Sequence, residues 1–299
     1  MESLVRFVVG LLLLTGLFAL LQRRWPAVVQ PRLRARELLT DLFYWLLTPQ
    51  LTRFVTQIVV LLVAGAWAVA VSGRLEPQAM VTAFSSRSPV GAQPIWLQAI
   101  EVVLLADLLG YWVHRAFHAD TWWRFHAIHH SPRRLSWLSS LRIHPVNDLL
   151  GSLLRVVPLF LLGFRLDVLG GYLPGAALYG LLIHANLRWD FGPLRYVIVS
   201  PAFHRWHHAA DEEGRDKNLA GLLPVWDLLF GTFYMPGHPP RRCGVDDPVP
   251  EGVLGQLAHP WRAGSPARGR APATRSRPAP STATVPGSPA VAPTIAGSA

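Results

Sequence analysis

The chain has 299 residues, of which 51% are hydrophobic and only 15% are charged. Soluble domains usually carry about 25% charged residues, so this composition disfavours a soluble enzyme. The formal net charge is +10, but the cations are almost all arginines that flank apolar runs, a pattern that orients a membrane protein and does not indicate nucleic-acid binding. Cys243 is the only cysteine, which excludes an intramolecular disulfide and a metal site built from four cysteines of one chain.

Three apolar runs, residues 4–21, 54–71 and 95–113, approach the roughly 20 residues with which a helix spans a membrane. We interpret the first run as an uncleaved anchor and not as a signal peptide, because Gln22, Arg23 and Arg24 follow it in place of a small-residue cleavage site. Between the first two runs, the pattern of residues 37–51 predicts an amphipathic helix that lies in the membrane interface.

Two shorter apolar runs, residues 149–164 and 168–183, contain Pro158 and Pro174. We expect a kinked hairpin that enters the membrane and returns, with a buried helix pair in a cytosolic core as the alternative. Residues 236–299 hold half of the chain's 26 prolines among small and polar residues. Such a composition buries too little apolar surface to fold, so it predicts a disordered tail.

The arginines predict the orientation of the chain in the membrane. Five of them follow the first run, which places that loop in the cytoplasm by the positive-inside rule: Arg23, Arg24, Arg32, Arg34 and Arg36. The second run then leads outward, residues 72–94 are external, and the third run returns to the cytoplasm at His114. The predicted fold is therefore an all-α, integral membrane helical bundle.

Histidines are concentrated in one part of the chain, where they form boxes of regular spacing. Residues 114–118 read HxxxH, and residues 126–130 and 204–208 both read HxxHH, while His144 and His184 stand alone. On a helix, positions i, i+3 and i+4 share a face, so the imidazoles of each box are expected to converge.

This supply of imidazole predicts a binuclear metal site. One metal ion takes about four to six ligands, so the ten histidines of residues 114–208 are enough for two ions. Any one of these histidines alone is more simply explained as a surface or core histidine. That explanation does not account for the repeated boxes. The HExxH signature of zinc hydrolases is absent, since Arg115 stands where its Glu would be. A histidine-rich pair of irons beside a membrane suits oxygen activation on a lipid chain.

Together the boxes resemble the membrane fatty acid hydroxylase/sterol desaturase superfamily. The resemblance is carried by residues 107–118, 126–130, 142–145, 184–196, 200–208 and 218–232. It implies membrane enzymes with a histidine-ligated di-iron centre, which use O2 and two electrons to hydroxylate or desaturate lipids or sterols. The implied cofactor is two Fe ions. By matching positions, the implied metal ligands are His114, His118, His126, His129, His130, His144, His184, His204, His207 and His208.

The sequence departs from the family pattern at two places. Some relatives carry a second histidine four residues after His184, where Arg188 stands here. An acidic residue often lies two positions after the proline of the R-x-H-P element, but here Asn147 occupies that position and Asp148 follows it. A contact that orients one of the ligands is therefore expected to differ.

The resemblance also divides the chain and implies its partners. Residues 1–94 are expected to form N-terminal transmembrane helices and the interfacial helix, residues 95–235 a fatty acid hydroxylase-like catalytic domain with a cytoplasmic histidine-rich di-metal cap, and residues 236–299 the tail. No flavin-, haem- or nucleotide-binding motif is visible, so the electrons are expected to come from an external donor, of the ferredoxin or cytochrome type with its reductase. The other expected partner is a lipid substrate. No catalytic residue beyond the metal ligands and no residue that binds an organic cofactor is predicted.

Several arginines and one acidic residue have open roles. Arg115, Arg205 and the pair Arg133 and Arg134 either dock the electron donor, bind a lipid head group or form a solvated cytoplasmic face. Asp107 lies within the third run, where a carboxylate is costly. We expect it either to orient a ligand imidazole or to pair with an arginine.

Two other functions compete with a lipid oxygenase. A non-catalytic metal-binding membrane protein that retains the boxes is the first. A metal transporter is the second, and it predicts histidine and aspartate at mid-depth along successive spans, whereas these histidines lie at the ends of the runs.

Overall fold

The computed structural model describes residues 2–30, 32–73 and 88–262, and over these residues all regular elements are helices, which confirms the all-α class. One short helix and a turn of 3-10 helix lie between the third and fourth long helices, and further short helices and 3-10 turns follow the last long helix. The long helices are α1 (Glu2–Arg24), α2 (Ala35–Ser72), α4 (Ile95–Phe117), α6 (Pro145–Leu161) and α7 (Leu166–His184). The short helices are α5 (Asp120–His130), α8 (Pro201–His207), α9 (Val225–Leu229) and α10 (Val253–Ala258).

Four helices are long and apolar enough to cross a membrane. Their candidate spans are Val5–Arg24, Ala35–Ala70, Ile95–Phe117 and Leu166–His184. The three long runs found in the sequence are thus helical, and the two shorter ones form a helical hairpin of α6 and α7 with Pro158 and Pro174 inside the helices. The entry of this hairpin into a membrane stays a prediction.

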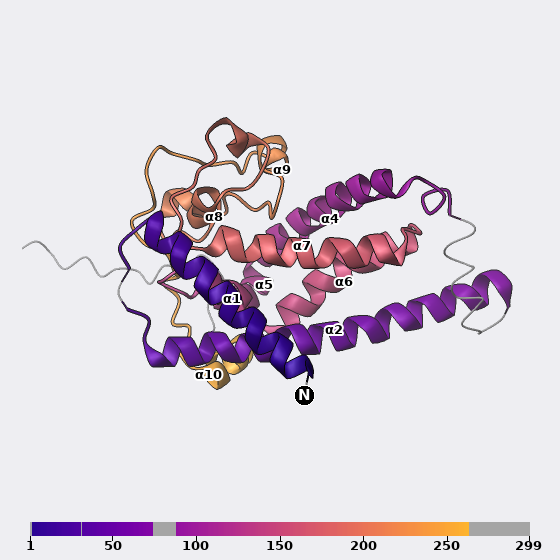
Figure 1. Ribbon diagram of the computed structural model, residues 1–299, viewed down its shortest axis with the longest axis horizontal. Helices are drawn as coiled ribbons and strands as arrows, with labels where there is room; N and C mark the ends of the chain where they lie inside the picture. Colours follow the sequence, from indigo (N-terminus) through magenta and orange to yellow (C-terminus); the bar gives the residue numbers. More distant parts are fainter. Residues whose placement is uncertain (1, 31, 74–87, 263–299) are drawn as a thin grey trace, which may run out of the picture. The chain divides into compact units, whose positions relative to one another are not determined.

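α2, α4, α6 and α7 run side by side (Figure 1). An apolar cluster joins these four helices and includes Ala64, Val102, Leu159 and Val168. α1 crosses them obliquely in Figure 1 and packs through Phe18, whose ring stacks on Trp137 with 5.2 Å between the ring centroids. The apolar faces of these helices therefore cover one another while their outer faces stay apolar and exposed, as expected of a bundle that spans a membrane.

The amphipathic helix expected at residues 37–51 is not a separate element, because α2 continues from Ala35 to Ser72 through Pro49. Its polar face does not lie free on a membrane surface either. Asp41, Trp45 and Thr48, which share a face at helical spacing, bind Arg142, the carbonyl of Leu138 and the carbonyl of Ile143. The polar side of this pattern thus docks α2 on the protein, while Leu39, Phe43 and Leu46 of the same stretch are exposed, so the place of this stretch in a membrane interface stays a prediction.

Residues 236–262 differ from the disordered tail expected to begin at residue 236. They include α10, and they are held by hydrogen bonds such as that from the Trp123 indole to Asp247 (2.6 Å) and that from the Gln256 side chain to the carbonyl of Pro250 (2.9 Å). Fixed polar partners thus compensate for the low apolar content of this stretch. The rest of the expected tail, residues 263–299, lies outside the described residues, as does most of the loop expected at 72–94.

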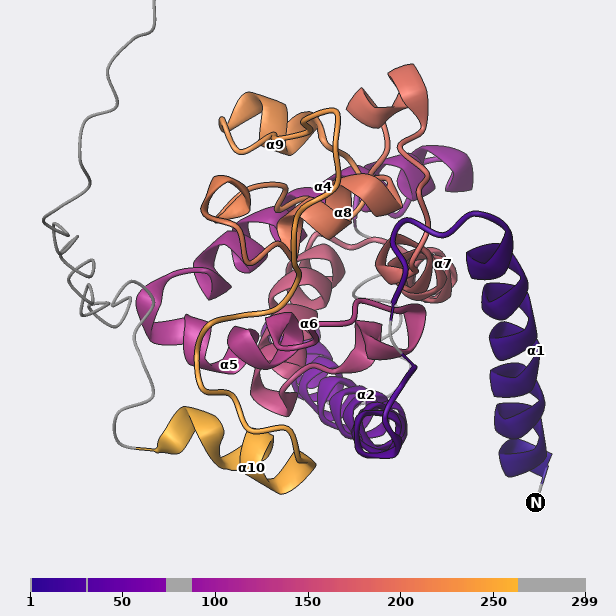
Figure 2. The same cartoon turned by 90° about the vertical axis from the view of Figure 1, so that its left-hand side faces the viewer.

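The helix ends that carry the histidines lie together at one end of the bundle. The C-terminal ends of α1, α4 and α7 and the start of α2 meet there (Figure 1), and Figure 2 faces this end. The backbone amide of Asn186, just after α7, donates to the Gln22 side chain, and that of Arg188 donates to the carbonyl of Trp25. The arginine-rich loop after α1 and the histidine boxes are therefore on the same side of the bundle.

Candidate metal centre

Four helices bring histidines to this end. His114 lies in the last turn of α4 and His118 caps its C-terminus, while α7 ends at His184. α5 carries the first HxxHH box. α8 carries the second, with Ser200 as its N-cap and His208 as its C-cap. The Ser200 side chain accepts a hydrogen bond from the amide of Phe203, which fixes where this short helix begins.

Nine of the predicted ligands come together in two groups. In each group, one potential ligand atom per residue lies within 4.8 Å of every other. The five-histidine group is His114, His118, His126, His130 and His207. The four-histidine group is His129, His184, His204 and His208. The groups adjoin each other, since the rings of His130 and His208 stack with centroids 4.4 Å apart.

Each HxxHH box serves both groups, although the spacing alone predicts that its three rings converge. In α5, His126 and His130 point to the five-histidine group and His129 to the four-histidine group. α8 does the reverse, because the pair at i and i+4 (His204 and His208) joins the four-histidine group and His207 joins the other. Adjacent residues on a helix differ by about 100° in direction. The two adjacent histidines of a box thus reach two neighbouring centres.

The imidazoles are oriented by oxygen atoms on their outer side. Carbonyl and carboxylate oxygens only accept hydrogen bonds, so the Nδ1 atoms that contact them carry the proton and leave a lone pair on Nε2. The Nδ1 partners, at 2.7–3.0 Å, are the carbonyl of Leu219 for His114, Asp216 for His118, Asn147 for His126, the carbonyl of Gly180 for His184 and the carbonyl of Lys217 for His207. This is the arrangement that orients histidine ligands in metal sites.

The inward nitrogens face each other at ligand spacing. The Nε2 atoms of His114 and His126 lie 3.0 Å apart, as do those of His184 and His204. Two lone pairs at this distance repel unless a cation binds both. Imidazole nitrogens at adjacent corners of an octahedral site, with metal–nitrogen bonds of about 2.1 Å, lie about 3.0 Å apart. The buried Nε2 of His207 also has no hydrogen-bond partner among the described residues. The donors present therefore fit a pair of transition-metal ions.

Burial keeps the rings in the form that binds metals. Loss of solvation holds the pKa of His129, His130, His204, His207 and His208 well below the ordinary value for histidine, and the neighbouring imidazoles lower it further. Neutral imidazole is the ligand form. The cluster is thus ready to bind metal without first losing protons.

His144, the tenth ligand implied by the resemblance, joins neither group. Its Nδ1 accepts a hydrogen bond from the amide of Val146 at 3.1 Å, so it caps the N-terminus of α6. Its Nε2 faces the carbonyl of Leu257 at 3.2 Å. Both ring nitrogens are therefore used in holding α6 to α10. Asn147, at the position where the sequence departs from the family, is the residue that contacts a ligand, with Oδ1 2.8 Å from His126 Nδ1.

Two aspartates fix the segment that supports His114. The carboxylate of Asp227 accepts hydrogen bonds from the amides of Leu219 and Ala220 (2.7 and 2.9 Å), and the carbonyl of Leu219 is the partner of His114. Asp107 neither contacts a ligand imidazole nor forms an ion pair among the described residues. It accepts from the amides of residues 222 and 223 and from the Trp226 indole, at 2.8–3.0 Å. It thereby ties α4 to the same segment.

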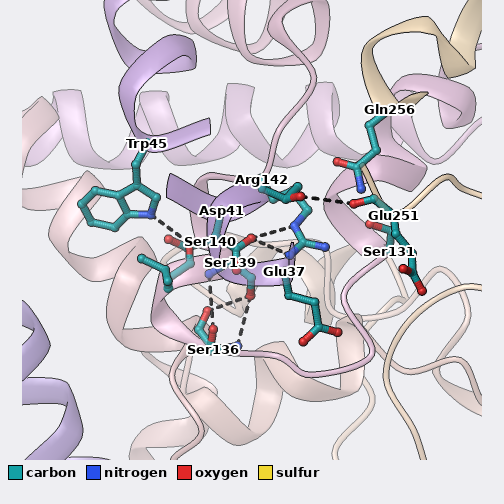
Figure 3. A network of polar contacts seen from close by, with 12 residues as sticks. Glu37, Asp41, Trp45, Ser131, Ser136, Ser139, Ser140, Arg142, Glu251 and Gln256 are labelled. Atoms are coloured by element: carbon teal, nitrogen blue, oxygen red, sulfur yellow. Dashed lines mark hydrogen bonds and ion pairs between the residues drawn. The ribbon is translucent and has the colours of Figure 1, made fainter. Parts of the chain in front are cut away.

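A buried ion pair ties α2 to the chain that follows the first HxxHH box. Arg142 donates from Nε and from a terminal nitrogen to Asp41 Oδ1 at 2.7 and 2.6 Å, and both side chains are almost fully buried (Figure 3). The sequence analysis missed Asp41 and Asp216 because each lies about 100 residues from its partner. An acidic residue on the face of a predicted amphipathic helix was the only signal.

The fold and the site together indicate an integral membrane protein, in which paired imidazole groups that could hold metal ions lie at one end of apolar helices. Residues 99–232 match the fatty acid hydroxylase family. This match confirms, over these residues, the resemblance to the membrane hydroxylase superfamily.

Known relatives agree with this assignment. The chain is similar to the ornithine lipid hydroxylase OlsE of Rhizobium tropici, with 37% identity over 171 residues that cover 56% of this chain and 52% of the relative. It is also similar to the alkylglycerol monooxygenases of Danio rerio (35% identity, 46% of this chain and 30% of the relative) and Homo sapiens (35%, 41% and 27%). The chain thus spans about half the length of the ornithine lipid hydroxylase and less than a third of the length of these two alkylglycerol monooxygenases. No solved structure matches it.

Proposed function

We propose that the protein is a membrane-bound di-iron oxygenase that hydroxylates a lipid. The convergence of nine imidazoles, eight of them buried, into two adjoining groups carries the proposal. Iron is the metal favoured here, because an all-imidazole set suits a redox-active first-row ion and the relatives are named as hydroxylases and monooxygenases.

The five-histidine group would hold one ion and the four-histidine group the other. When bound, the pair would supply the redox chemistry in which a C–H bond, O2, two electrons and two protons give an alcohol and water. The electrons come from an external donor of the ferredoxin or cytochrome type.

The protein's own contribution is placement. The Nδ1 acceptors hold five rings so that their Nε2 atoms point inward, and this avoids reorganising the ligands during turnover. An apolar cluster that includes Tyr111, Ile183, Val199 and Phe203 borders His114 and His184. It keeps water away from the bundle side of the groups, which is the side from which a lipid chain would approach.

The names of the relatives favour a polar lipid with a long chain, such as an ornithine lipid or an alkylglycerol, as the substrate class, and hydroxylation over desaturation. A fatty acyl or alkyl chain fits these names better than a sterol. We place the histidine groups on the cytoplasmic side, since the arginine-rich loop after α1 lies at the same end.

Comparison of lipid extracts tests the proposal. Cells that express the chain and cells that express the His207→Ala variant are extracted, and their lipids are compared by mass spectrometry. We expect one polar-lipid class to gain a single oxygen atom, from ¹⁸O2, only with the unaltered chain. Identical extracts in a lipid background that contains the candidate classes would contradict an oxygenase. They would instead favour a non-catalytic metal-binding membrane protein.

A further inference from the structure

An arginine-lined cavity of about 550 Å³ lies beside the histidine groups and plays no part in the proposed chemistry. Its walls come from four separate stretches: residues 28–41, residues 131–142, Arg205, and residues 240–256. Eight arginines line it against four acidic residues, an excess of four positive charges. The arginines are Arg32, Arg34, Arg133, Arg134, Arg142, Arg205, Arg241 and Arg242.

Some of this charge is already neutralised by ion pairs among the described residues, but the charge of the buried Arg205 is not. Arg142 is paired with Asp41, and Arg242 is paired with Asp246. Arg205 is 3% exposed and forms no ion pair within the described part of the chain. It donates to the Asn186 side chain at 2.9 Å, while its Nε has no partner there. A buried guanidinium without a carboxylate is costly, so a bound anion would complete its environment.

The cavity is built onto the outer wall of the metal centre. Arg205 stands between His204 and His207 on α8, and Ser131 and Pro132 directly follow His130. Residues 242–244 pair with the chain just after the second HxxHH box: the amide of Ala210 donates to the carbonyl of Arg242, and that of Gly244 to the carbonyl of His208. A ligand in the cavity would therefore contact the segments that hold both boxes.

The chemistry of the walls selects the ligand class. Arginine is suited to phosphate, because its planar donors match the oxygens of that group. The volume is within the range of small-ligand sites, whereas a docked protein would need about 800 Å² of surface on each partner. We propose that this cavity binds a phosphate-bearing small anion, supplied either by a soluble phosphate ester or by a phospholipid head group. This proposal goes beyond the oxygenase function and does not depend on it.

Binding of a labelled probe to the purified full-length protein tests the proposal. The protein, with its metal, is held in neutral detergent and titrated with radiolabelled inorganic pyrophosphate. We expect saturable binding that Arg205→Gln weakens by about tenfold or more, as for loss of a charge-assisted hydrogen bond. Arg165→Gln is the matched control. It removes the same charge at an exposed arginine that is paired with Asp167 in the turn between α6 and α7, so its affinity is expected to stay within about twofold of the parent.

A second variant guards against misfolding of the buried position. Arg133 and Arg241 line the cavity and are exposed, so the double variant R133Q/R241Q is expected to fold and to bind pyrophosphate more weakly than R165Q. Competition by micelles that contain phosphatidic acid, but not by neutral phosphatidylcholine, identifies a head group as the source. Lack of such competition identifies a soluble ester.

Three outcomes would overturn the proposal. The first is that neither pyrophosphate nor phosphatidic acid binds saturably. The second is equal affinity in R205Q, R133Q/R241Q and R165Q, and the third is binding of polyglutamate that pyrophosphate does not displace. The last would indicate a surface for an acidic protein. Because the assay measures binding and not turnover, its failure is distinct from failure of the oxygenase proposal.

Discussion

The two histidine groups share their boxes but are supported in different ways. In the five-histidine group, two rings contact side chains, Asp216 and Asn147, and two contact carbonyls of residues 217 and 219. In the four-histidine group, the one such contact is to the main chain, at Gly180 for His184, and the buried Nδ1 atoms of His129, His204 and His208 have no hydrogen-bond partner among the described residues. The comparison teaches that one centre can be tuned by side-chain changes, while the other is set by where helices begin and end.

The largest expected effect comes from removing one ligand of either group. His207→Ala and His208→Ala change adjacent residues of α8 that serve different groups. We expect each variant to lower activity by more than about 100-fold and to remove about one metal ion per chain, because the affected group loses one of its imidazole donors. Metal analysis and turnover of the purified variants check this. The protein should stay in the membrane fraction, and full turnover by either variant would show that its ring is not a ligand.

The next effect is on stability, through the buried ion pair that holds α2. Asp41→Ala leaves Arg142 buried without its partner, which typically costs about 3–5 kcal/mol. We expect a lower thermal midpoint in detergent. The double change D41L/R142M removes both charges and is expected to recover part of the midpoint. A midpoint for D41A equal to that of the parent would show that the ion pair does not stabilise the fold.

A smaller effect is expected from the side-chain support of the five-histidine group. Asn147→Leu removes the oxygen that contacts His126 Nδ1, and loss of such a contact typically lowers metal affinity by about 10–100-fold. Asn147→Asp keeps an acceptor and is expected to bind metal within a few-fold of the parent. Competition with a chelator measures both. If N147L and N147D bind metal equally well, the contact does not orient the ligand.

The smallest effect is expected at the histidine that lies outside both groups. His144→Ala removes the N-cap of α6 and a contact to Leu257, which is worth about 1 kcal/mol. We expect a slightly lower thermal midpoint with unchanged metal content. Loss of one metal ion in this variant would restore His144 as a ligand.

The sequence predicted much of this arrangement because its signals are local. Box spacing and apolar runs predicted the helices and nine histidines that the fold brings together in the two groups. The division of each box between two groups was not predicted, since helical periodicity defines a shared face but not two neighbouring centres on it. His144 was assigned by resemblance, yet at the start of α6 an imidazole also makes a good cap. Asp41 and Asp216 act across long separations in the chain, which periodicity does not reveal.

The most direct test of the central claim is the metal stoichiometry of the full-length protein, measured together with X-ray absorption at the metal edge. The account predicts about two iron ions per chain, each surrounded by nitrogen and oxygen donors only, and about one ion in His207→Ala and in His208→Ala. A fully active preparation that holds a single ion, or variants that lose no metal, would contradict it.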